Sequence, residues 1–238
     1  MIQAKSVLFC GALLTVTAFS LPAQSEEWSV LESRGVKLKS GDTVEASQKL
    51  TLLQGQRLTL LSPSGKTVKL QGPVEQAPAD EAQGSTSDLG GAVAALITER
   101  QGRREQGAIR NGPGHPLPEP WIIDVTENGQ RCVMPEEAII FWRGPGGGDQ
   151  KLTISPADRS WQASAEWPAG SEKLLLRNIP IRDRASYAIS LGSETHNITL
   201  NIIPRSITND AMRLTFLYEK MCDWQGDALS DRLKTAQN

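Results

Sequence analysis

The chain has 238 residues, a formal net charge of -2 and 22% charged residues. This balance excludes a polybasic nucleic-acid-binding protein and a strongly acidic tail. With 39% hydrophobic residues, the chain can bury two modest cores joined by a polar connector. We therefore expect one large domain or two small ones.

The first 23 residues predict a secretory signal peptide. Lys5 is the only charge before the apolar stretch Val7–Leu21, and Pro22-Ala23 supplies a cleavage site ahead of a polar segment. The alternative, a membrane anchor, is disfavoured because about 15 apolar residues are fewer than a spanning helix needs. We expect a bacterial periplasmic or secreted protein that keeps no transmembrane span after cleavage.

Two cysteines remain after removal of the signal peptide, Cys132 and Cys222. An even number of cysteines in an exported protein predicts a disulfide, and the alternative is two separately buried thiols. Closing a loop of about 90 residues would constrain the unfolded chain by roughly 4–5 kcal/mol.

Residues 28–75 predict a small β domain. Short alternating segments are separated by turn residues at regular intervals, which is typical of a meander or a small barrel. The alternating pairs are Val36 and Leu38, Leu50 and Leu52, Leu58 and Leu60, and Val68 and Leu70. We expect Arg57–Leu61 and Thr67–Gln71 to form a hairpin around Ser62-Pro63-Ser64-Gly65.

The spacing of these residues from Leu38 to Leu70, with Gly41-Asp42, Gly55 and Ser64-Gly65 between them, resembles the domain of FecR-type envelope proteins. Those are periplasmic β modules, some of which relay a surface signal to an inner-membrane regulator. The resemblance does not extend to a spanning helix or a cytoplasmic segment. It therefore implies at most a non-catalytic envelope module.

Residues 76–120 read as a linker. Gln76–Ser87 is dominated by Pro, Ala, Gly, Gln and Ser, a composition that buries little apolar surface. A single helix is expected near residues 88–104, with Ser87 or Asp88 as its N-cap. Asn111–Pro120 contains four prolines and predicts an extended end to the linker.

Residues 121–238 predict an antiparallel β-sandwich closed by a C-terminal helix. Short strand candidates are separated by Gly, Pro and Asp, and the helical pattern begins after Pro204, with Thr208 or Asn209 as N-cap. The helix is expected to run to about Asp223, to break over Asp223–Gly226, and to resume over Ala228–Lys234. The strand candidates are Trp121–Val125, Arg131–Met134, Ala138–Trp142, Lys151–Ser155, Trp161–Trp167, Lys173–Arg177, Ser186–Leu191 and Asn197–Ile203.

Part of this region resembles the immunoglobulin fold. Asp183 and Tyr187 resemble the tyrosine corner before strand F, and Cys132 precedes Trp142 much as the first core cysteine precedes the strand-C tryptophan. Ile189 stands where the second cysteine would be. The resemblance implies a structural corner at Asp183 and Tyr187, and a Cys132 that is free to reach Cys222.

No residue pattern predicts a catalytic or metal site or a cofactor. The glycine-rich loop Gly144–Asp149 lacks the lysine of a phosphate-binding loop, and neither His115 nor His196 has a second ligand at metal-binding spacing. A serine nucleophile elbow is also missing. A cryptic hydrolase would have to use His196 as its base, and we keep this as an alternative.

The six tryptophans allow two interpretations. Exposed side chains, with Trp161 and Trp167 on one strand face, could stack on sugar rings, whereas buried ones would fill small cores. Arg143, beside the glycine-rich loop, is our candidate for a functional polar contact.

The sequence thus favours an exported, non-enzymatic β-protein that acts as a binding or sensory accessory module through contacts with another envelope protein. The alternatives are a carbohydrate or cell-wall binding module and the hydrolase that uses His196.

Overall fold

A computed structural model describes residues 26–82, 98, 116–135 and 138–236. These residues form a mainly β protein with a helical C-terminal end, in agreement with the predicted fold class. The predicted signal peptide over residues 1–23 and all but one residue of the helix expected near 88–104 lie outside the described residues.

The N-terminal body is a small β structure with its own core. Its main sheet is antiparallel in the order β2-β1-β4-β5, and a second pair joins β3 to β6. The predicted hairpin is present, because β4 and β5 pair from Arg57↔Gln71 to Leu61↔Thr67. The strands are β1 (Glu27–Arg34), β2 (Thr43–Glu45), β3 (Leu50–Leu52), β4 (Arg57–Leu61), β5 (Thr67–Gln71) and β6 (Val74–Gln76), followed by the short helix α1 (Pro78–Glu81).

Alternation along these strands explains that core. In β5, Val68 and Leu70 are buried while Lys69 and Gln71 are exposed, so one face of the sheet is apolar and the other is exposed to solvent. Buried partners come from the neighbouring strands, among them Trp28, Val30, Val44, Leu50, Leu52, Leu58 and Leu60.

The second body is a two-sheet sandwich. One sheet has the order β11-β10-β13-β14-β8 and the other the order β12-β9-β7. Most pairs are antiparallel, but β8 lies parallel to β14 and β7 lies parallel to β9. The strands are β7 (Ile122–Asp124), β8 (Gly129–Val133), β9 (Ile139–Trp142), β10 (Gln150–Pro156), β11 (Ala163–Trp167), β12 (Lys173–Leu176), β13 (Ala185–Leu191) and β14 (Glu194–Ile202).

The inward side chains of both sheets form one apolar cluster. Phe141, Trp167 and Tyr187 are its largest members, and all three are almost completely buried. They meet aliphatic side chains that alternate with polar residues along β10, β13 and β14. These are Leu152, Ile154, Ile189, Ile198 and Leu200.

Two helices complete the chain, α3 (Asp210–Glu219) and α4 (Asp223–Ala236). Asn209 is the N-cap of α3, as predicted, and its side chain accepts a hydrogen bond from the backbone N–H of Met212. The helical break comes earlier than the sequence indicated, at Met221, whose positive φ of 57° ends α3. The segment Asp223–Gly226, expected to be the break, is the first turn of α4.

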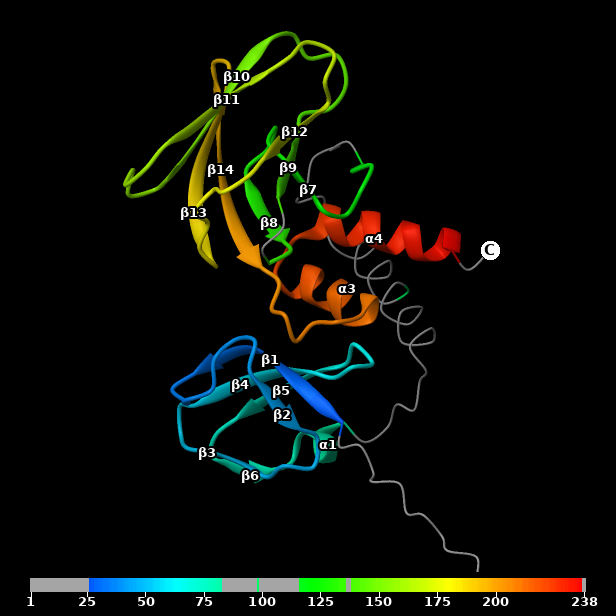
Figure 1. Cartoon of the computed structure of the whole chain (residues 1–238). Helices are drawn as coiled ribbons and strands as arrows, with labels where there is room; N and C mark the ends of the chain where they lie inside the picture. Colours follow the sequence, from blue (N-terminus) through cyan, green and yellow to red (C-terminus); the bar gives the residue numbers. More distant parts are fainter. Residues whose placement is uncertain (1–25, 83–97, 99–115, 136–137, 237–238) are drawn as a thin grey trace, which may run out of the picture.

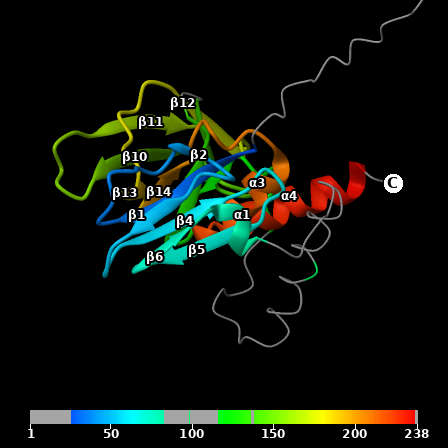
Figure 2. The same ribbon diagram turned by 90° about the horizontal axis from the view of Figure 1, so that it is seen from below.

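In Figure 1, α3 (orange) lies between the two β bodies, and α4 (red) lies beside the sandwich near β8. Seen from below, the N-terminal strands lie across the sandwich while both helices extend to one side (Figure 2). A shared apolar cluster joins the bodies: Leu31 and Leu61 of the N-terminal sheet pack with Phe216 and Leu217 of α3. The two predicted β domains are therefore in direct contact through α3.

Polar contacts accompany that shared cluster. The Oγ atom of Ser29 donates to the backbone oxygen of Ser206 at 3.0 Å, and the Oγ1 atom of buried Thr215 donates to that of Gly65 at 2.8 Å. At the edge of the contact, the Nζ atom of Lys69 lies 3.2 Å from a carboxylate oxygen of Glu219.

Candidate binding surface

Arg143 serves the fold and leaves no donor for a ligand. Its side chain is 8% exposed, and its guanidinium lies 4.9 Å from the ring centre of Trp167. All five N–H groups donate hydrogen bonds of 2.7 to 3.3 Å, to the backbone oxygens of Gly147, Gly148, Pro168 and Ser171 and to the side chain of Gln150. The functional contact predicted for Arg143 is thus replaced by a structural role, which is to hold the glycine-rich loop against the sandwich.

The tryptophans do not form an exposed platform. Trp167 is completely buried, and its Nε1 atom donates to the backbone oxygen of Ser171 at 2.8 Å. Trp161 is half-buried against Tyr187, with ring centres 5.9 Å apart. None of the six tryptophans is exposed, so the sugar-stacking role considered for Trp161 and Trp167 is not supported by their placement.

Tyr187 and Asp183 each accept a hydrogen bond from a backbone N–H at the predicted structural corner. The hydroxyl of Tyr187 accepts a hydrogen bond from the backbone N–H of Arg182 at 2.8 Å. The Oδ1 atom of Asp183 accepts from the backbone N–H of Ile202 at 2.9 Å, which ties the corner to the end of β14. Both residues therefore position strands.

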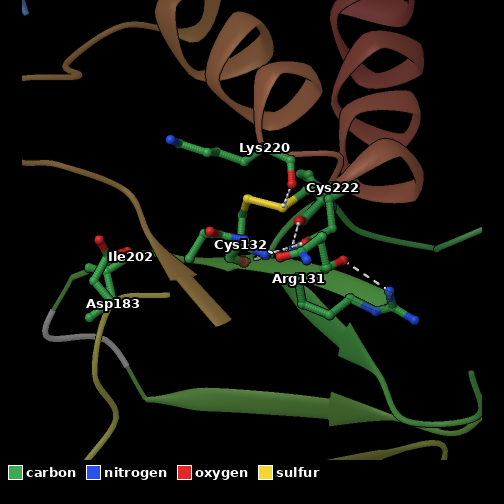
Figure 3. Close-up of a disulfide and its surroundings, with 10 residues drawn as sticks. Arg131, Cys132, Asp183, Ile202, Lys220 and Cys222 are labelled. Carbon is green, nitrogen blue, oxygen red and sulfur yellow. Dashed lines mark hydrogen bonds between the residues drawn. A yellow bond between two sulfur atoms is a disulfide. The ribbon is translucent and has the colours of Figure 1, made fainter. Parts of the chain in front are cut away.

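The structure contains the disulfide between Cys132 and Cys222, with their Cα atoms 5.9 Å apart. Figure 3 shows the bridge joining β8 to the junction between α3 and α4. Gln225 strengthens this junction: its Oε1 atom accepts from the N–H of Cys132 at 2.7 Å, and its Nε2 atom donates to the backbone oxygens of Cys132 and Pro120. The amide side chain thus satisfies the backbone N–H and oxygen of Cys132, which a neighbouring strand would otherwise pair with at the open edge of β8.

Arg131, next to the bridge, is a second buried arginine whose hydrogen bonds are made within the fold. Its guanidinium donates to the backbone oxygens of Asp124, Glu127 and Gln130, and it lies 3.8 Å from the carboxylate of Asp124. Burial lowers the pKa of Arg131 from its usual value, because a charged group loses hydration there, while Asp124 and Glu127 oppose that shift.

His196 lacks the partners that a catalytic base needs. It pairs with Ile189 across the sheet, and its Nε2 atom lies 3.6 Å from a carboxylate oxygen of Glu194 without a hydrogen bond. His196 lines none of three surface hollows, which lie beside Ser29 and Ser206, beside Gln130 and Gln225, and beside Arg57 and Glu219. The geometry therefore offers no support for the hydrolase alternative.

The described part of the chain contains neither a metal-binding cluster nor a membrane-spanning helix. No group of three or more His, Cys, Asp or Glu side chains there could hold a metal ion. Among the same residues, no helix has the length and apolar character needed to cross a membrane.

The most distinctive surface is a part of the outward side of the five-stranded sheet, the three rows of residues named below, which we call the outer polar face. Strand pairing aligns its side chains in three rows, on the side opposite the buried Leu152, Tyr187 and Ile198. The rows are Ser164, Thr153, Ser190 and Thr195; Ser155, Ala188 and Asn197; and Ser186, Thr199 and Gln130. No charged residue occurs among these positions, and every side chain is short or of medium length.

Cross-strand hydrogen bonds fix the side chains of this face. Hydroxyl pairs join Thr153 to Ser164 at 3.2 Å, Ser186 to Thr199 at 3.0 Å, and Ser190 to Thr195 at 2.8 Å. At one end, the next outward pair is Lys151 opposite Glu166. At the other end, Asn201 and Cys132 lead to the disulfide and the helices.

The sequence contains a signal for this face, namely the kind of residue that alternates with the buried residues along each strand. Within β10, β13 and β14, the residues that alternate with the buried aliphatic ones are Ser, Thr, Ala and Asn, apart from Lys151. Their gathering on one surface depends on strand order, because β10 pairs with β13 across an intervening stretch of about 30 residues.

Comparisons with protein-family models and with curated proteins found no match for this chain.

Proposed function

We propose that this protein is a non-enzymatic binding module of the bacterial envelope, and that it docks a partner protein on the outer polar face. The observation that carries the proposal is the absence of charge across three aligned rows of outward side chains. Buried Arg131 and Arg143 use their donors within the fold, which supports a role in binding through surface shape rather than through a reaction centre.

Physical reasons favour protein docking at such a face. Charged residues are depleted at the centre of protein interfaces, because removing their hydration is costly. Short side chains that already bond to one another also lose little conformational freedom on binding. A surface that only contacts water is normally rich in Lys and Glu, which this face lacks.

The predicted export supports the assignment to the envelope. A disulfide persists in oxidising compartments, and Cys132 and Cys222 form one here. The FecR-like spacing in the N-terminal body is compatible with an accessory or sensory role in the periplasm, and that role is part of the proposal.

The proposal can be tested by site-specific photo-crosslinking in intact cells that naturally express the chain. A photoreactive residue at Thr199 should give one discrete adduct with another protein, recovered in the periplasmic fraction after osmotic shock. Ala188→Arg, which adds a long charged side chain at the middle row, should abolish that adduct while the thermal unfolding curve stays two-state.

Thr51 provides the matched control, because it is an exposed strand residue on β3 of the other body. A photoreactive residue there should give no adduct, and Thr51→Arg should leave the Thr199 adduct intact. An adduct that survives both Ala188→Arg and Ser190→Arg would show that the outer polar face is not the docking surface. A cytoplasmic adduct would contradict the envelope assignment.

A further inference from the structure

An unusual pair of like charges lies on the N-terminal sheet. Arg34 of β1 is directly opposite Arg57 of β4, so both side chains leave the same face of the sheet. Like charges in directly opposed positions destabilise an antiparallel pair. Both arginines are exposed, and within the described residues neither side chain forms a hydrogen bond or an ion pair. No direct hydrogen bond or ion pair of these two side chains therefore offsets this repulsion.

The two arginines line a hollow of about 350 Å³ between the β1-β4-β5 surface and the C-terminal end of α3, which we call the basic hollow. Gln71 lies opposite Arg57 on β5 and adds an amide to the same wall. Lys69 also lines the hollow, but Glu219 already pairs with it at 3.2 Å. Glu32 is the remaining charged group.

The charges of the basic hollow suit a single negative charge. Three cations, Arg34, Arg57 and Lys69, face two carboxylates, Glu32 and Glu219, which leaves a net charge of +1. A carboxylate would neutralise this excess and could accept paired hydrogen bonds from the guanidinium groups. A doubly charged phosphate would exceed this single positive charge.

We propose that the basic hollow binds a carboxylate side chain of an acidic peptide segment from another protein. The exposed position of both arginines leaves the hollow open to solvent, which does not favour enclosing a free small molecule. An extended peptide can instead continue along the exposed row formed by Arg34, Arg57 and Gln71. This site lies on the N-terminal body and is independent of the outer polar face.

The test is a nuclear magnetic resonance titration of the full chain after export, observing the arginine Nε–H signals. The probe is a short peptide carrying a single glutamate, with its glutamine analogue and inorganic phosphate as comparison ligands. We expect the glutamate peptide to shift the signals of Arg34 and Arg57, and the other two ligands to shift them much less at equal concentration.

Variants identify the residues responsible. Arg34→Gln and Arg57→Gln should each weaken binding of the glutamate peptide by about fivefold, the effect of losing one exposed ion pair. Arg177→Gln removes an exposed arginine outside the hollow and should leave the affinity unchanged. Arg34→Gln should also keep or raise the thermal midpoint, because it relieves the repulsion between the two arginines.

Three results would overturn the proposal. The first is unchanged Arg34 and Arg57 signals at saturating peptide, and the second is equal shifts with the glutamine analogue. The third is a stronger response to phosphate than to the peptide, which would assign the hollow to phosphate groups.

Discussion

Single glycines in the loop beside Arg143 decide how firmly that arginine is held. A Cβ atom added at Gly147 would lie 2.6 Å from the Cζ and Nε atoms of Arg143, whereas one added at Gly148 would meet nothing within 4 Å. Neither glycine has a positive φ, so the backbone itself would accept alanine at both positions. The difference between the two sites is therefore one of space around Arg143.

We predict that Gly147→Ala lowers the free energy of unfolding by about 1–3 kcal/mol, because Arg143 must move away from its five acceptors. Gly148→Ala is the matched control, and it should change stability by less than about 1 kcal/mol. Urea denaturation of both variants provides the measurement. Equal effects would show that Arg143 is not a fixed part of the loop.

Among the secondary-structure elements, β8 is held to the two helices by a disulfide and by side-chain hydrogen bonds. The disulfide fixes Cys132 of β8 to Cys222, just before α4, and Gln225 in the first turn of α4 bonds to the backbone of the same strand residue. Gly226 lets α4 approach α3, since a Cβ atom there would lie 2.5 Å from the ring of Tyr218. The helical break at Met221 precedes this contact in the chain.

Replacing both Cys132 and Cys222 with alanine should lower the free energy of unfolding by about 4–5 kcal/mol, the chain-entropy value for a loop of this length. Denaturant titration of the oxidised protein and of the double variant measures the difference. Gln225 should retain part of the junction, so the variant should still fold cooperatively. A loss below about 1 kcal/mol would mean that the bridge does not limit the unfolded chain.

In the whole molecule, α3 connects the two β bodies by packing against both. Leu31 and Leu61 share an apolar cluster with α3, and Thr215 bonds to the β4–β5 turn. The composition between Glu75 and Pro120 predicts that a protease cuts there first, into two fragments. The structure adds that these fragments have a common core to keep them together.

We therefore predict that the two fragments of a limited digest elute together in gel filtration under native conditions. Because both cysteines belong to the C-terminal fragment, the disulfide cannot account for such co-elution. Leu61→Ala should weaken the association, because it removes apolar surface from the shared cluster. Val68→Ala, inside the N-terminal core, is a control for general destabilisation. Separate elution of the unmodified fragments would contradict the cooperative contact.

Alternation, capping residues and cysteine number predicted the β character of both bodies, the β4–β5 hairpin, an N-cap at Thr208 or Asn209 and a disulfide between the two cysteines, because these are local or countable properties. The structure places the N-cap at Asn209 and contains the disulfide. The sequence misplaced the first strand: β1 covers Glu27–Arg34, while the expected segment around Val36 and Leu38 lies in a bend and an irregular stretch after it. Tertiary structure decided the burial of Arg143 and Trp167, the gathering of uncharged side chains on one sheet face, and the opposition of Arg34 and Arg57. Each of these depends on register between strands distant in sequence, which no local pattern specifies.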